Sequence, residues 1–331
     1  MADKQLNNMP KADASGGKEE LILSAFQQYQ EKSAVDAGGF LVASMNDCLK
    51  KAKELPPLKV LFPNVVLEGD LCILFGQSGI GKTIFAMQIA REIAAQGYRV
   101  LYIDFEMTLR QLVLRYESTD FPSTFFRAEI DKNNLIEDVL KGIEQAALAN
   151  YAEVVFIDNI TALGQSLDKG SDAGTLMAAL NTLKKQYNWT LVVLNHVPKA
   201  FCGAIPLSLS AIQGSAKLNQ LVDDAIGIGQ SSKDPSIVYV KQCKWRNGET
   251  ILDPGHVALY ERGKNACGNL CFTFVDFGIE SEHLMQENSS TRDALRAEVI
   301  DLLNSGMTQQ QVADKLHISQ SKVSRLLKDN G

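Results

Sequence analysis

The chain has 331 residues, of which 45% are hydrophobic and 22% charged, and its formal net charge is −6. These values are ordinary for a globular protein, and the negative charge excludes a general attraction to nucleic acid, so any such contact must come from local patches. The sequence has no apolar run of 18 residues and no secretory signal, and we interpret its six cysteines as reduced structural thiols, which together predict a cytoplasmic protein without a membrane span.

The N-terminal part of the chain precedes the main domain. Residues 1–20 are polar and predict a disordered terminus. Residues 21–57 have weak helical periodicity that stops at Pro56-Pro57, and we interpret them as a helical linker or packing segment. The pattern leaves open whether this segment packs on its own core or on a neighbouring subunit.

A phosphate-binding loop then organises the chain. Leu71–Phe75 predicts a strand and Ile84–Ala95 a helix, and the segment between them fits G-x-x-x-x-G-K-[ST]. Glycines allow the backbone to approach a triphosphate, and the helix N-terminus attracts its charge. The loop consists of Gly76, Gln77, Ser78, Gly79, Ile80, Gly81, Lys82 and Thr83. We expect ATP as ligand, with Lys82 on its phosphates and the Thr83 hydroxyl on Mg²⁺.

Three further apolar strands follow at Val100–Asp104, Val154–Asp158 and Thr190–Leu194, separated by helical patterns. Alternating strands and helices predict an α/β fold with a mainly parallel sheet flanked by helices, in which ligands bind at the carboxyl ends of the strands. Glu106, Asp158 and His196 lie at such ends.

Two carboxylates at these ends suit ATP hydrolysis. Asp158 ends a fully apolar strand and has the form of a Mg²⁺-binding residue. Glu106 is able to orient an attacking water as a general base, although a solvated carboxylate at a strand end would look the same.

The chain changes character after residue 194. Lys199–Gly214 is a long loop, and several short strands separated by turns follow it. The stretch from Phe277 to Ser290 is polar and acidic. We therefore expect an ATPase core at 58–280, a linker at 281–290 and a separate C-terminal unit at 291–331.

The order of these motifs resembles the RecA/DnaB class of ring-forming ATPases, and in particular DnaB-type replicative helicases and RepA-type plasmid helicases. The resemblance covers residues 58–275 and implies a RecA-like fold and a homo-oligomeric ring or filament. It implies that Glu106 is the catalytic base and that His196 senses the γ-phosphate. It also implies that the loops at 161–174 and 199–214, with Lys199 in the second, bind single-stranded DNA.

A K-x-R-x-G element at Lys244–Gly248 is part of the same resemblance, and in that family it enters the active site of the neighbouring subunit. RepA-like relatives carry an Arg before the Gly-Ser of the second loop, but this chain has Gln213. The resemblance therefore leaves Lys244, Arg246 or Lys217 as the residue that acts in trans. Basic residues are sparse in the two loops, which argues against a processive motor.

The C-terminal unit has the pattern of three short helices and looks like a helix-turn-helix, similar to those of bacterial transcription regulators and resolvases. The exposed face of its third helix would contact duplex DNA. That face offers Gln320, Ser321, Lys322, Ser324 and Arg325.

Two functions fit this sequence. The first is an ATP-hydrolysing, ring- or filament-forming DNA-binding protein of plasmid or mobile-element replication or maintenance, with DNA helicase activity as one form of it. The second is an ATP-gated transcription or copy-number regulator whose helix-turn-helix reads a specific operator without unwinding it.

Overall fold

The computed structural model describes residues 35–36, 41–130, 139–160, 173–197, 203, 205–212, 220–285, 289–316 and 318–328, and the chain divides into two units, Met1–Pro57 and Leu58–Gly331. In the first unit, β1 (Val35–Asp36) pairs antiparallel with β2 (Leu41–Val42). Helix α2 (Met45–Glu54) follows, and the Ser44 hydroxyl caps it by accepting a hydrogen bond from the Asp47 amide (3.1 Å). The expected disordered terminus at 1–20 lies outside the described residues.

A nine-stranded sheet forms the core of the second unit, in the order β13-β12-β11-β10-β5-β9-β8-β6-β7. The six strands from β10 to β7 are parallel, and β11, β12 and β13 extend the sheet in antiparallel fashion. The strands are β5 (Leu71–Gly76), β6 (Val100–Asp104), β7 (Phe125–Ala128), β8 (Val154–Asp158), β9 (Thr190–His196), β10 (Asp224–Gln230), β11 (Ile237–Lys244), β12 (Val257–Lys264) and β13 (Leu270–Gly278). The predicted mainly parallel α/β sheet is confirmed.

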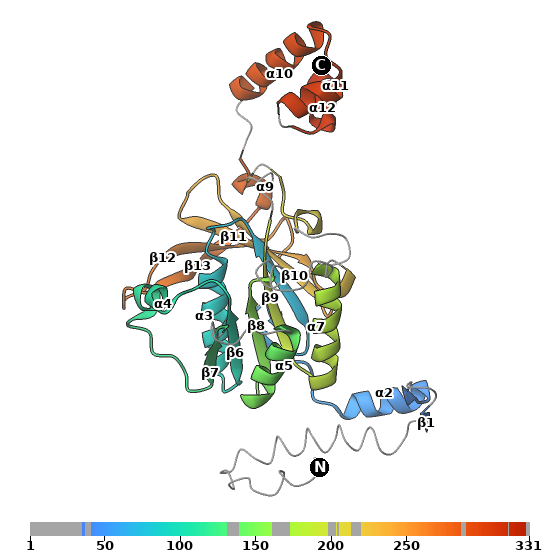
Figure 1. Ribbon diagram of the computed structural model, residues 1–331, viewed down its shortest axis with the longest axis vertical. Helices are drawn as coiled ribbons and strands as arrows, with labels where there is room; N and C mark the ends of the chain where they lie inside the picture. The colour runs from blue at the N-terminus through green and yellow to red at the C-terminus, as the bar shows by residue number, and fades with distance from the viewer. Residues whose placement is uncertain are drawn as a thin grey trace, which may run out of the picture. The chain divides into compact units, whose positions relative to one another are not determined.

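Helices cover both faces of this sheet (Figure 1). Helices α3 (Lys82–Ala95) and α4 (Leu109–Tyr116) pack on one face, and α5 (Val139–Ala149) and α7 (Ala173–Tyr187) on the other. Strand β5 serves both layers because its side chains alternate: Cys72 and Leu74 join the α3 layer, and Ile73 and Phe75 join the α5–α7 layer.

The structure adds elements that the sequence analysis did not predict. A small hairpin of β3 (Val60–Phe62) and β4 (Val66–Leu67) precedes β5, and β7 forms one edge of the large sheet. The linker expected at 281–290 overlaps helix α9 (Glu280–His283), which follows β13 directly. Both Glu280 and His283 are buried.

A buried ion pair explains why this polar segment is ordered. Lys241 Nζ lies 2.6 Å from Glu280 Oε2 and donates to the Leu207 carbonyl (2.7 Å), while Glu280 Oε1 accepts from the Leu207 amide (2.8 Å). We call this arrangement the Leu207 clasp. It fixes a residue of the loop after β9, just before the 3₁₀ turn η1 (Leu209–Ala211), to both β11 and α9.

The carboxylate cluster Asp70, Asp223 and Asp224 is buried at the amino edge of the sheet, where β5 and β10 begin. Burial, the largest cause, raises the pKa of Asp224 to about 7, and the nearby charge of Asp70 acts in the same direction. Burial also raises the pKa of Asp70, although Asn247 donates to both of its carboxylate oxygens (2.7 and 2.9 Å).

The C-terminal segment forms three helices with their own core: α10 (Ser289–Asn304), α11 (Gln309–Lys315) and α12 (Gln320–Lys328). Val299, Val312 and Val323 meet in that core, and Thr308 and Gln311 form a capping box at the start of α11. The three predicted helices are confirmed. Among the described helices, none is long and apolar enough to cross a membrane.

We predict that breaking the Leu207 clasp from one side destabilises the core. Glu280→Ala leaves the Lys241 ammonium buried without its carboxylate, which costs roughly 3–5 kcal/mol of unfolding free energy, whereas Lys241→Met combined with Glu280→Leu costs much less. Urea unfolding of the three proteins measures both effects. An equal loss in the single and double variants would show that the pair does not act as a unit.

We also predict that stability falls with rising pH because of Asp224. An aspartate in the unfolded chain titrates near pH 4, so between about pH 4 and 7 the folded state holds a proton that the unfolded state has lost. The free energy of unfolding should therefore fall across this window, on the order of 2–4 kcal/mol, and level off above it. Asp224→Asn should make the slope shallower in urea midpoints measured from pH 4 to 8. The exposed Asp120→Asn should not, and an unchanged slope in Asp224→Asn would contradict the assignment.

Candidate active site

The phosphate loop joins β5 to α3 and requires glycine at two positions. Gly79 and Gly81 have φ angles of +79° and +100°, in the left-handed region that other residues rarely adopt. A Cβ atom on Gly81 would also lie 2.8 Å from Cζ of Phe272, which comes from β13. The antiparallel extension of the sheet therefore packs directly against the loop.

Lys82 is held inside this loop. Its side chain donates to the carbonyls of Gly76 (2.9 Å) and Gln77 (2.8 Å) and lies 3.0 Å from His196 Nδ1. Burial lowers its pKa to about 8, opposed by the charges of Asp158 and Glu106. The ammonium group is thus poised at the mouth of the loop, where the phosphates of a nucleotide would replace its carbonyl partners.

Asp158 and Thr83 form the oxygen-donor part of the site. The Thr83 hydroxyl and the Tyr102 hydroxyl (2.8 Å) both donate to the Asp158 carboxylate. Burial raises the pKa of Asp158 to about 6, and these hydrogen bonds oppose the shift. A hydroxyl and one carboxylate fit Mg²⁺, which takes oxygen ligands and is commonly shared with substrate phosphates. The described residues contain no cluster of three or more His, Cys, Asp or Glu side chains for a metal held by protein alone.

Glu106 follows β6 in a turn that two other residues brace. Asp104 Oδ1 accepts from the backbone amides of Glu106 (3.0 Å) and Met107 (2.8 Å). Arg127, from β7, donates to Asp104 Oδ2 (2.9 Å) and to the Met107 carbonyl (2.7 Å). The backbone beneath Glu106 is therefore fixed, and its side chain is partly exposed to solvent.

The Glu106 carboxylate meets His196 and Asn159. His196 Nε2 lies 3.5 Å from Glu106 Oε1, Asn159 Nδ2 donates to the same oxygen, and the two nitrogens are 3.0 Å apart. The hydrogen bond with His196 is the main cause that lowers the pKa of Glu106, so the carboxylate stays ionised near neutral pH. The sequence analysis did not identify Asn159; its place directly after Asp158 was the one available indication.

Lys244 and Arg246 lie at the opposite edge of the sheet from the phosphate loop. Lys244 pairs with Ala225, which is level with Ile73 near the start of β5, whereas Gly76 ends that strand. The Lys244 ammonium donates to the Val222 carbonyl (2.6 Å), and Arg246, half-exposed, lies 2.6 Å from Asp223 Oδ1. Asp223 also pairs with Lys184 (2.5 Å). The structure thus brings together Lys82, Thr83, Glu106, Asp158 and His196 but not the K-x-R-x-G cations.

The remaining expected DNA contacts fall in two groups. Lys199, Lys217 and the loop at 161–172 lie outside the described residues. In α12, Gln320, Ser321 and Arg325 are exposed and Lys322 and Ser324 are half-buried, while Val323 and Leu326 point into the three-helix core.

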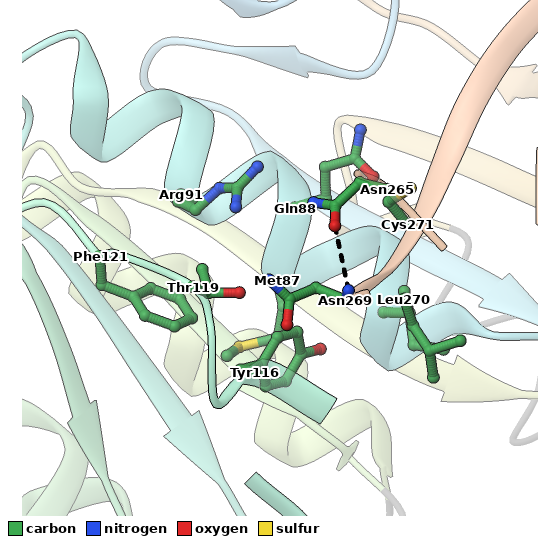
Figure 2. Close-up of a pocket in the computed structure, with 11 residues that line it drawn as sticks. Met87, Gln88, Arg91, Tyr116, Thr119, Phe121, Asn265, Asn269, Leu270 and Cys271 are labelled. Atoms are coloured by element: carbon green, nitrogen blue, oxygen red, sulfur yellow. Dashed lines mark hydrogen bonds between the residues drawn. The ribbon is translucent and has the colours of Figure 1, made fainter. Parts of the chain in front are cut away.

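Figure 2 shows a pocket beside the phosphate-loop helix, between α3, the end of α4 and the turn that joins β12 to β13. It encloses about 20 Å³, which is room for a single water molecule and far too little for a nucleotide. The buried hydroxyl oxygens of Tyr116 and Thr119 line it and have no hydrogen-bond partner among the described residues. We therefore interpret it as a hydration site and not as part of the nucleotide site.

Two family models match parts of this chain, and several known proteins are similar to it. Residues 43–200 match the family described as an AAA domain, and residues 290–331 match a homeodomain-like domain. The DNA repair protein RadA of Mycobacterium tuberculosis is 23% identical over 283 residues, covering 77% of this chain and 55% of RadA. The DNA repair protein RadA of Campylobacter jejuni is 25% identical over 160 residues, covering 48% of this chain and 33% of that protein. This chain therefore spans only a third to just over half of these relatives.

A solved KaiC-like protein from Pyrococcus horikoshii has 19% identity and a TM-score of 0.49, covering 64% of this chain and 94% of its own. The matched AAA domain contains the phosphate loop and its carboxylates, and the homeodomain-like match contains the three C-terminal helices. The chain is therefore an ATPase whose core is similar to the AAA domain and carries a phosphate loop, and its C-terminal unit is similar to a homeodomain-like domain.

Proposed function

We propose that this protein is an ATP-hydrolysing, DNA-binding homo-oligomer, a ring or filament, that serves plasmid or mobile-element replication or maintenance in the cytoplasm. The observation that carries the proposal is the convergence of Lys82, His196 and Glu106 beside the phosphate loop. In a hydrolytic site, a cation on the phosphates, a sensor of the γ-phosphate and a base for water must meet in this way.

Each group has a distinct role in the proposed reaction. Lys82 would bind the β- and γ-phosphates, and Asp158 and Thr83 would hold Mg²⁺, which would supply positive charge at the phosphates. Glu106, ionised because His196 lowers its pKa, accepts a hydrogen bond from the attacking water and orients it. The brace from Asp104 and Arg127 keeps that carboxylate in place.

His196 links the phosphates to the rest of the core. It contacts Lys82 on one side and Glu106 on the other, so a phosphate that draws Lys82 away changes the environment of the ring. The loop after β9 follows directly, and we propose that it carries this change to single-stranded DNA through residues such as Lys199.

Oligomerisation is proposed from the position of the K-x-R-x-G cations. Lys244 and Arg246 belong to the edge opposite their own phosphate loop, so a head-to-tail neighbour is the partner whose nucleotide they could reach. Duplex DNA is assigned to the helix-turn-helix, whose α12 offers Gln320, Ser321 and Arg325 on its exposed side.

We predict that single-stranded DNA stimulates ATP turnover. Steady-state turnover with no DNA, single-stranded DNA and duplex DNA measures this, with Glu106→Gln as the variant that binds ATP but loses roughly 10²–10⁴-fold in turnover. Strong stimulation by single strands supports a translocating enzyme, and an unwinding assay then tests helicase activity. If single-stranded DNA leaves ATP turnover unchanged and the protein binds one duplex sequence tightly, the ATP-gated regulator is favoured. Undiminished turnover in Glu106→Gln would remove the assignment of the base.

We further predict that Arg246 acts in trans. Arg246→Ala should lower turnover by about 10³-fold, as the loss of an arginine finger does. Mixing it with Glu106→Gln should restore part of the activity, because a mixed assembly contains sites with an intact Glu106 beside a neighbour with an intact Arg246.

Two controls define that experiment. Lys185→Ala removes an exposed cation at the same end of the molecule and should leave turnover unchanged. Mixing Arg246→Ala with the double variant Glu106→Gln/Arg246→Ala should restore nothing. Recovery in that second mixture, or none in the first, would exclude Arg246 and direct the same test to Lys244 and Lys217.

A further inference from the structure

Asn159 occupies the centre of the proposed catalytic network. It follows Asp158 at the carboxyl end of β8, and its residue is only 2% exposed. Its side-chain nitrogen contacts both Glu106 Oε1 and His196 Nε2. A buried amide in this position costs stability unless its polar groups are hydrogen-bonded, and the group that accepts from its nitrogen here is the Glu106 carboxylate.

The protons in this network follow from which groups are able to donate. The Lys82 ammonium only donates, so His196 Nδ1 must accept from it, and the neutral ring then carries its hydrogen on Nε2. The Glu106 carboxylate only accepts, so Asn159 must present its nitrogen to it. Two N–H donors, from His196 and Asn159, therefore meet at the same Glu106 oxygen, and the 3.0 Å contact between their nitrogens is one between two donors and not a hydrogen bond.

We propose that Asn159 is a positioning residue for ATP hydrolysis, which fixes the Glu106 carboxylate beside the His196 ring. This inference rests on the proposed role of Glu106 as the base. Asn159 directly follows Asp158 in the chain. The same short piece of backbone therefore positions the Asp158 carboxylate and, through the Asn159 side-chain amide, the Glu106 carboxylate. Misplacement of a catalytic group by about 1 Å costs roughly 10²-fold in rate.

If Asn159 positions Glu106, its loss should lower ATP turnover without weakening ATP binding, whereas the loss of a purely structural asparagine would not have this selective effect. Asn159→Ala removes the donor to Glu106 without touching the phosphate loop. We expect kcat to fall by about 10–100-fold. The affinity for a fluorescent ATP analogue with Mg²⁺ should stay within about twofold, because Lys82 and its loop hold the phosphates. Asn159→Ser keeps a donor on a shorter side chain and should recover part of kcat.

The matched control is Asn150→Ala. Asn150 precedes the same strand β8 at its other end, is half-buried, and donates to the Ala146 carbonyl (2.8 Å). Its loss should affect thermal stability alone. If Asn159→Ala lowers stability and ATP affinity but leaves kcat intact, as a structural residue would, the proposal is overturned. If Asn159→Ala does not fold, the comparison of Asn159→Ser with Asn159→Asp decides it, since only Ser retains a donor.

A double variant separates this inference from the proposal beneath it. With Glu106→Gln already at residual turnover, adding Asn159→Ala should lower the rate no further, because both act through one carboxylate. A further drop of equal size would show that Asn159 acts independently of Glu106 and would overturn the positioning role. If Glu106→Gln alone keeps full turnover, the base assignment fails instead, and Asn159 fails with it as a partner of Glu106.

Discussion

The register of the parallel strands is the constraint on which the rest of the site depends. Gly76 of β5 pairs with His196 of β9, and Asp104 of β6 pairs with Asp158 of β8, so the carboxyl ends of these four parallel strands lie at the same edge of the sheet. The apolar side chains of these strands set that register, since a slip of one residue would exchange the two buried faces. The polar side chains at the strand ends are brought together because the apolar side chains of the same strands pack between the sheet and its covering helices.

The sequence was sufficient for the parts of the site that are local. The phosphate loop and the polar residues at strand ends follow from motif and periodicity alone, and Lys82, Glu106 and His196 meet as that pattern predicts. Arg127 could not be foreseen in this way, because it reaches Asp104 only after β7 pairs with β6. Asn159 looked like an ordinary residue after a strand until its neighbours were known. The long-range pairing supplies the groups that position the catalytic ones.

The same limit explains the error at the end of the core. The stretch from Phe277 to Ser290 is polar and acidic, and from this composition we expected a linker at 281–290, where helix α9 in fact continues to His283. Glu280 becomes a buried residue only because Lys241 and the backbone of Leu207 satisfy its carboxylate. A buried charge of this kind has no periodic signature in the sequence, since its partner lies 39 residues away.

The Leu207 clasp links the loop after β9 to the segment that precedes the three C-terminal helices. This loop follows His196, which lies 3.0 Å from Lys82 of the phosphate loop, and Leu207 within it is tied to α9, the last core element before those helices. Met285, beyond α9, also donates its amide to the Gly203 carbonyl (2.9 Å). A displacement of Leu207 would therefore either move α9 with it or break a buried ion pair.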